Sequence, residues 1–124
     1  MPAIAKKDGQ SSISATDGII GSLCGVKPNR YNWNTPSTQV SDGGSDDVFV
    51  EGVGVVRDGD AMETHPDGSP CTVSAINHTP TLSTFSNNVF ANGKAIGRIG
   101  DKYNQGTSFD HTIITGASTV IANG

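Results

Sequence analysis

The sequence contains few apolar residues and very few aromatic ones. Of its 124 residues, 34% are hydrophobic and 6% are aromatic, whereas 16 are glycine. A chain of this length with so little apolar material can bury only a thin core, so a disulfide, a metal ion or a partner is expected to add stability. The length predicts one domain over residues 1–124.

Positive charge and long hydrophobic runs are also scarce. The chain has 8 Lys and Arg against 12 Asp and Glu, a net charge of -4, which argues against nucleic acid as a partner. No apolar run approaches membrane-spanning length, and residues 1–8 lack the pattern of a secretory signal peptide. We therefore expect synthesis in a cytoplasm, where the two cysteines are more often thiols than a disulfide.

The clearest local signal is a β-hairpin at residues 88–101 (NVFANGKAIGRIGD). Val89 and Phe90 favour a strand, and Asn92-Gly93 favours a type I′ turn, in which both central residues need positive φ. No segment has the periodicity of a useful helix. The Gly, Asn, Ser and Thr content and the hairpin spacing predict an all-β fold with long loops.

The hairpin pattern recurs along the chain. Residues 47–60 (DVFVEGVGVVRDGD) align with 88–101 without a gap, and residues 119–124 (TVIANG) repeat its first half. Residues 2–9 (PAIAKKDG) match its second half. The simplest arrangement is a closed ring of three hairpins whose third member combines the two ends of the chain. This arrangement predicts adjacent terminal strands and pseudo-threefold symmetry.

Polar segments separate these hairpins. Residues 27–47 are rich in Pro, Asn, Ser, Asp and Gly and predict a long loop insertion, while 61–81 and 102–109 predict further loops. Tyr31 and Trp33 lie in the first loop. They either contact a partner or pin this loop onto the small core.

All three histidines, His65, His78 and His111, lie in the second half of the chain, with Cys71 between the first two. Three imidazoles and one thiolate are a full tetrahedral ligand set for Zn²⁺, although the spacing is not that of a zinc finger. In the ring arrangement the loops that carry these residues meet at one pole. A closed site leaves no position for a catalytic water, so the ion would be structural. Cys24 is the alternative sulfur ligand, but it requires longer loops and lies in an apolar context.

Catalytic motifs are missing. The chain has no nucleophile elbow, phosphate-binding loop or spaced calcium-binding loop, so no catalytic residue is predicted and the protein is not expected to be an enzyme. Two alternatives stay open. One is a small zinc hydrolase with an open metal position, and the other is a carbohydrate- or receptor-binding β module that uses Tyr31 and Trp33.

Residues 88–101 resemble the PAAR repeat, whose usual form reads roughly TVFINGKPAARVGD. Residues 116–124 (GASTVIANG) are similar to its start, GSPTVFING, and residues 2–6 resemble Pro-Ala-Ala-Arg with one residue added. The chain departs from the repeat in places: Ala95 stands at the proline and Lys6 at the arginine. The resemblance covers the strands but not the loop at 27–47.

The resemblance implies a small cone or pyramid that caps the trimeric central spike of a contractile injection machine, either a phage tail or the VgrG protein of type VI secretion. It implies a structural zinc ion near the apex, held by His65, Cys71, His78 and His111. It also implies synthesis in a bacterial cytoplasm, assembly at the tip of the spike, and transient contact with the target membrane during piercing. Effector proteins are a further implied partner, and the loop at 27–47 is the candidate region that would carry them.

Overall fold

The protein is described by a computed structural model over residues 2–16, 37–67, 76–107 and 110–122. All regular structure in these ranges is β, which confirms the predicted class for this part of the chain. None of these residues belongs to a helix that could cross a membrane. The strands are β1 (Ser12–Thr16), β2 (Ser37–Val40), β3 (Phe49–Val50), β4 (Val53–Gly54), β5 (His65–Asp67), β6 (Ile76–His78), β7 (Phe90–Ala91), β8 (Lys94–Ala95) and β9 (Asp110–Ile113).

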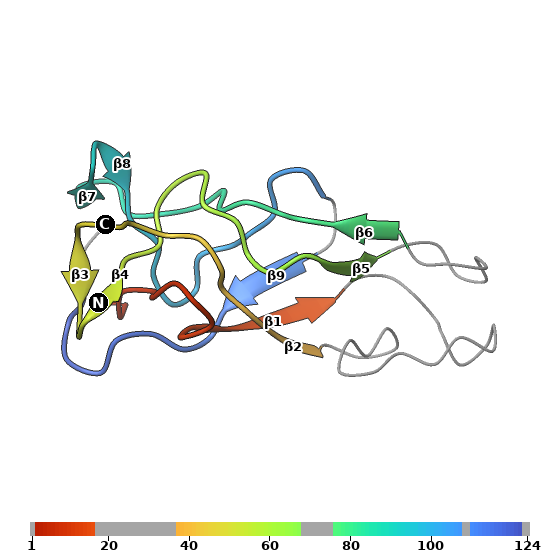
Figure 1. Cartoon of the computed structure of the whole chain (residues 1–124), viewed down its shortest axis with the longest axis horizontal. Helices are drawn as coiled ribbons and strands as arrows, with labels where there is room; N and C mark the ends of the chain where they lie inside the picture. The colour runs from red at the N-terminus through yellow and green to blue at the C-terminus, as the bar shows by residue number, and fades with distance from the viewer. Residues whose placement is uncertain (1, 17–36, 68–75, 108–109, 123–124) are drawn as a thin grey trace.

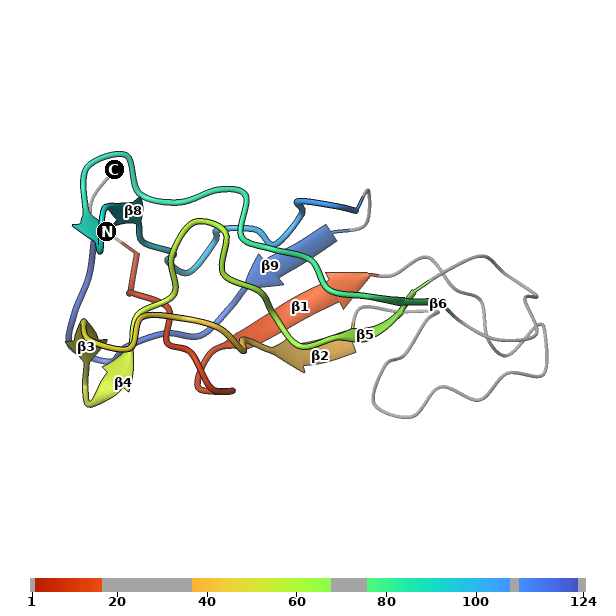
Figure 2. The same ribbon diagram turned by 45° about the horizontal axis from the view of Figure 1, so that its top comes forward.

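The strands form small antiparallel sheets. One has three strands in the order β2-β1-β9, and the pairs β3–β4, β5–β6 and β7–β8 form two-stranded sheets. Figure 1 shows β3, β4, β7 and β8 at one end of the molecule, which we call the hairpin end. Strands β5 and β6 lie toward the opposite end, with the three-stranded sheet between, and the turned view in Figure 2 keeps this separation.

The two complete hairpins form where the sequence predicts them. In the β7–β8 turn, φ is 56° at Asn92 and 75° at Gly93, so both central residues are left-handed as an Asn-Gly hairpin turn requires. The β3–β4 turn has the same geometry, with φ of 52° at Glu51 and 79° at Gly52. A glutamate with positive φ is uncommon, and contacts of its side chain described below hold it in place.

The two ends of the chain pair with each other, as the repeats predict. Ala3 forms an antiparallel bridge with Ile121, and Ile4 N donates a hydrogen bond of 3.1 Å to Val120 O. The same bond occurs in both complete hairpins, again at 3.1 Å, from Val55 N to Val48 O and from Ile96 N to Val89 O. The terminal segments therefore form a third pair at the hairpin end.

Backbone hydrogen bonds join the three pairs in closed cycles. Ala5 N donates to Gly97 O (2.9 Å), Gly97 N to Val56 O (2.8 Å), and Val56 N to Ala5 O (3.1 Å). A second cycle runs in the opposite sense and consists of bonds from Lys7 N to Gly54 O, Asp58 N to Ala95 O and Ile99 N to Ala3 O, at 2.9, 2.7 and 2.9 Å. Each pair thus donates to one neighbour and accepts from the other in each cycle.

The core consists of two clusters of buried apolar residues. The first lies among the hairpins and contains Ile4, Val50, Val55, Ala91, Ile96, Ala117 and Ala122. The second contains Ala5, Ile13, Val56, Met62, Leu82, Tyr103 and Ile113. Leu82 fills the space beside Gly97, because a Cβ atom there would lie 2.9 Å from Leu82 Cδ2. Of these fourteen residues only Tyr103 is aromatic and four are alanine, so the core is thin for the length of the chain.

Tyr103 places a hydroxyl in the second cluster. The side chain is fully buried, and its hydroxyl has no hydrogen-bond partner among the described residues. Burial raises the pKa of this phenol, and the nearby Asp60 and Asp42 carboxylates add to the effect. Because an unpartnered buried hydroxyl costs free energy, Tyr103→Phe is expected to raise the free energy of unfolding by about 1 kcal/mol. Urea denaturation measures the change, and a loss of stability would contradict it.

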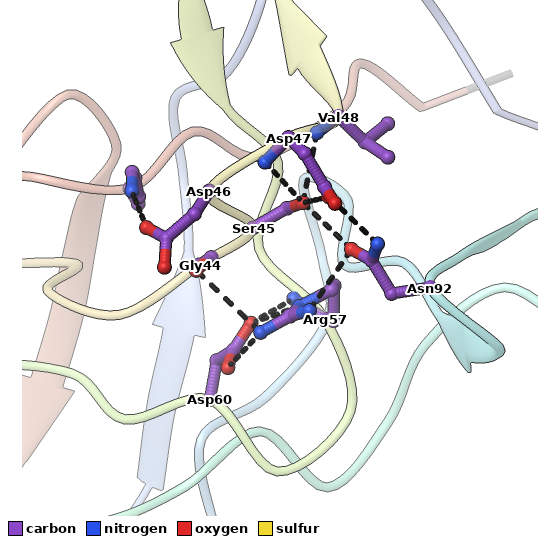
Figure 3. Close-up of polar contacts among 9 residues, drawn as sticks. Gly44, Ser45, Asp46, Asp47, Val48, Arg57, Asp60 and Asn92 are labelled. Atoms are coloured by element: carbon purple, nitrogen blue, oxygen red, sulfur yellow. Dashed lines mark hydrogen bonds and ion pairs between the residues drawn. The ribbon is translucent and has the colours of Figure 1, made fainter.

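Polar side chains tie the second hairpin to the first (Figure 3). Arg57 Nε donates to Asp60 Oδ2 at 2.9 Å, and Arg57 Nη1 donates to Asn92 Oδ1 at 3.0 Å. The Asn92 amide in turn donates to Asp47 Oδ1 at 2.7 Å, and Ser45 Oγ lies 2.7 Å from Asn92 Oδ1. The turn of the second hairpin is therefore fixed to the segment that enters the first.

A different set of side chains ties the terminal segments to the first hairpin. The Glu51 carboxylate accepts hydrogen bonds from Thr119 N (2.9 Å) and Thr119 Oγ1 (2.8 Å), and it forms an ion pair with Lys6 Nζ at 3.3 Å. In the repeat alignment Glu51 corresponds to Asn92, and Lys6 corresponds to Arg57. The position is thus used in the same way in two repeats, with a carboxylate in one and an amide in the other.

The Glu51 contacts predict how stability depends on pH. Hydrogen bonds from the Thr119 hydroxyl, the Thr119 N–H and the Lys6 ammonium lower the pKa of Glu51 below its ordinary 4.5. The native state therefore binds fewer protons than the unfolded state just below that pH. The stabilisation is complete above about pH 4.5 and is lost as the pH falls through the lowered native pKa.

Glu51→Gln is expected to remove this contribution. The stability difference between the native protein and the variant should be largest at neutral pH and should shrink as the pH falls below about 4.5. Denaturant unfolding at a series of pH values measures the difference. If the free energies of unfolding of the native protein and the variant differ by the same amount from pH 7 to pH 3, the ionised Glu51 carboxylate does not contribute to stability.

The turn after the third pair differs from the sequence alignment. In the second hairpin Arg98 N donates to Asp101 Oδ2 at 2.8 Å, and the alignment places Gly9 opposite Asp101. In the structure Ser11 Oγ takes the role of that carboxylate and accepts from Lys6 N at 2.8 Å. The oxygen that accepts this hydrogen bond therefore lies two residues later than the alignment places it, because Gly9 has no side-chain oxygen.

Two predicted loops contain strands. β2 lies inside 27–47, and β5 and β6 lie inside 61–81. The loop prediction was wrong at these strands because each finds a partner for its backbone polar groups, β2 on β1 and β5 on β6. Tyr31 and Trp33 lie outside the described residues.

Candidate metal centre

Three short strands carry the histidines. His65 begins β5 and His78 ends β6, and the two are direct partners in the antiparallel register. His111 lies in β9, opposite Ala15 of β1. The prediction that all three lie in loops was therefore wrong. In β9 the buried residues alternate, and His111 and Ile113 share the buried face, so the imidazole occupies an inward strand position.

The three imidazoles meet through their Nε2 atoms. His78 Nε2 lies 2.6 Å from His65 Nε2, and His65 Nε2 lies 3.0 Å from His111 Nε2. The ring centroids are 4.3 Å apart for His65 and His78, 5.0 Å for His65 and His111, and 5.3 Å for His78 and His111. One donor atom from each residue thus faces a common point.

A backbone carbonyl fixes the tautomer of the central ring. His65 Nδ1 lies 2.8 Å from Glu63 O, and because a carbonyl only accepts, Nδ1 carries the proton. In the neutral imidazole, Nε2 then presents a lone pair to the other two rings. This is the outer hydrogen bond that metal-ligating histidines commonly make, and it orients the ring as well as the lone pair.

The site is largely closed to solvent. His65 is 1% exposed and His111 is fully buried, whereas His78 is partly exposed. The backbone of His111 is held on both sides, since its N–H donates to Asn104 Oδ1 at 3.0 Å and its carbonyl accepts from Tyr103 N at 2.9 Å. His111 is therefore anchored to the second core cluster, which contains Tyr103.

The geometry fits a metal ion. Ligand atoms from His65, His78 and His111 all lie within 4.8 Å of one another. Zinc–nitrogen bonds of about 2.0–2.1 Å in a tetrahedral site place two imidazole nitrogens about 3.3 Å apart. The His65–His111 distance of 3.0 Å is near this value, and the His65–His78 distance of 2.6 Å is shorter. Lone pairs this close repel unless a proton or a cation lies between them. The donor set of three imidazoles suits zinc, copper, iron or nickel.

The predicted sulfur ligand lies outside the described residues, as does its alternative. Cys71 is in 68–75 and Cys24 is in 17–36. The structure thus brings together the three predicted histidines, and the thiolate stays a prediction. Neither Glu63 O nor Asn104 could be recognised from the sequence, because a backbone carbonyl can belong to any residue and the Asn104 contact depends on the path of the chain.

The site and the hairpin end lie apart. β5, β6 and β9, which carry the histidines, are separated from β3, β4, β7 and β8 along the long axis in both ribbon views. No protein-family model matches the chain, and comparison with curated proteins likewise gave no match.

Proposed function

We propose that the protein is the metal-stabilised tip of the trimeric central spike of a contractile injection machine, a phage tail or a type VI secretion system. Three features support the proposal: the PAAR-like repeats, the joined hairpins at one end, and the histidine cluster toward the other. In this proposal the molecule is a cone with pseudo-threefold symmetry, and it has no catalytic role.

The observation that carries the proposal is the cyclic hydrogen bonding of the hairpin end. Ala5, Val56 and Gly97 bond to one another in a ring, and each belongs to a different pair. In this proposal a single chain offers three similar faces around one axis, and this is what a cap needs in order to match a true trimer. The end of a spike β-helix has unpaired backbone groups that aggregate unless they are covered. Strand addition by the hairpin end is a suitable way to cover them.

In this proposal the metal ion makes the part of the molecule around the histidines rigid. His65, His78 and His111 would hold it, with Cys71 as the fourth ligand, and zinc is the ion that this donor set favours. A bound ion supplies cross-linking among β5, β6 and β9 and thus adds stability that a thin core lacks. His65 is held by Glu63 O and His111 by Asn104, so two ligands are positioned before metal binds.

The experiment that tests the function is reconstitution with a trimeric spike protein from the same organism. Light scattering of the purified complex should give one chain per trimer, and electron microscopy should place its density at the end of the spike. A failure to form this complex would overturn the proposal. Turnover of a hydrolysable substrate that depends on the metal would favour the hydrolase alternative, since catalysis requires an open metal position.

A further inference from the structure

Three large apolar side chains of the hairpin end are unusually exposed. Phe49 is 58% exposed, Phe90 is 59% and Ile121 is 53%, and these are the most exposed large apolar residues of the described chain. Each is followed by a small or medium apolar residue that is buried in the first core cluster, at Val50, Ala91 and Ala122 respectively. Each pair of strands therefore turns one apolar side chain inward and leaves the one before it exposed.

The three side chains occupy the same position in the three pairs. Phe49 is the register partner of Gly54, Phe90 that of Ala95, and Ile121 that of Ala3. The three partners are the residues whose carbonyls accept in the second hydrogen-bond cycle. The exposed side chains are thus related by the same repetition that joins the backbone.

The residues two positions before these exposed side chains carry different functional groups. Asp47, Asn88 and Thr119 occupy this position in the three repeats, and all three are exposed. A carboxylate, an amide and a hydroxyl can each accept a hydrogen bond, but they differ in charge and in the donors they carry. The exposed apolar side chain is more alike at the three corners than this polar group, so it is the feature that a symmetric surface would recognise at all three.

We propose that Phe49, Phe90 and Ile121 are anchors that fill three identical apolar pockets on the end of a homotrimeric partner. This inference rests on the proposed function, and it specifies the contact: one kind of pocket, used three times, by three different parts of one chain. Apolar anchors that are buried in pockets commonly dominate the affinity of an interface.

Site-specific photo-crosslinking tests the inference. Each variant is the full chain with p-benzoylphenylalanine at one position, Phe49, Phe90 or Ile121, and it is expressed in the organism that encodes the protein. The crosslinked residue of the partner is then identified by mass spectrometry. We expect all three positions to label the same residue of the same partner, because only a symmetric partner presents one residue to three sites. Ile114, which is 46% exposed but directly follows β9, is the matched control and should not label that residue.

Affinity measurements with the purified partner that crosslinking identifies complete the test. Phe49→Ala and Phe90→Ala should each weaken binding about tenfold or more, by similar factors. Ile121→Phe should bind at least as tightly as the native protein, because a pocket that accepts Phe49 and Phe90 also accepts phenylalanine at the third corner. All three residues are exposed, so these variants are expected to fold.

The outcomes separate this inference from the proposed function. Labelling of one residue in a trimer that is not a spike would support the anchors and overturn the function. Labelling of a spike from only one of the three positions would support the function and overturn the anchors. Crosslinks to a second copy of this chain, or to different residues from each position, would overturn the anchors as well.

Discussion

Loss of the metal is expected to lower the melting temperature of the protein by about 10 °C or more. Structural zinc sites contribute several kcal/mol to folding, and about 1 kcal/mol corresponds to roughly 3–6 °C for a domain of this size. The effect should be large here because His65, His78 and His111 connect the β5–β6 sheet to β9, which belongs to a different sheet. Treatment with a chelator, followed by calorimetry, measures the change.

His65→Ala provides the matched test. It should reduce the metal content, determined by elemental analysis, from about one ion per chain, and it should lower the melting temperature in a similar way. The chelator should then have little further effect on the variant, since the same contribution cannot be lost twice. A metal-free native protein, prepared without chelator, or an additive effect of chelator and variant would contradict the metal centre.

The two cysteines offer a second matched pair. Cys71→Ser should reduce the metal content and the melting temperature, whereas Cys24→Ser should leave the metal content unchanged. The reverse result would show that Cys24 is the sulfur ligand. If neither variant changes the metal content, the ion is held by the imidazoles with a ligand other than cysteine.

Much of the hairpin end could be predicted from the sequence because its signals are local. Asn92-Gly93 demands a particular turn, and the repeat at 47–60 shows that the same hairpin forms twice. The pairing of the chain ends followed from two half-repeats, 2–9 and 119–124, that are each incomplete. The two hairpins required no knowledge of how distant segments meet, and the pairing of the ends required only that the two half-repeats complete each other.

The sheet β2-β1-β9 could not be predicted in the same way. β1 pairs with β2 and β9, and its residue Ile13 is opposite Gln39 on one side and Ile113 on the other. Such partners are distant in sequence, and the polar composition of 11–18 and 27–47 is typical of loops. For the same reason the three histidines could be proposed as ligands from their chemistry, but not placed on strands.

Gly54→Ala is expected to be the most damaging small substitution at the hairpin end. A Cβ atom on Gly54 would lie 2.0 Å from Ser45 O and 2.7 Å from Lys7 Cε. Ser45 cannot easily retreat, because its N–H donates to Val55 O at 2.8 Å and its Oγ accepts from Val48 N at 2.9 Å. Overpacking against fixed backbone costs about 3 kcal/mol, which urea denaturation would detect directly.

The second hairpin supplies the control, since Ala95 occupies the position that Gly54 occupies in the first. Ala95 is only 7% exposed, so the second hairpin accommodates the methyl group that the first excludes. Ala95→Gly should cost only about 1–2 kcal/mol, from the lost methyl burial and the greater freedom of glycine. A Gly54→Ala variant as stable as Ala95→Gly would mean that the entry to the first hairpin can shift. The hydrogen-bond cycle through Gly54 O and Lys7 N would then not be a rigid part of the hairpin end.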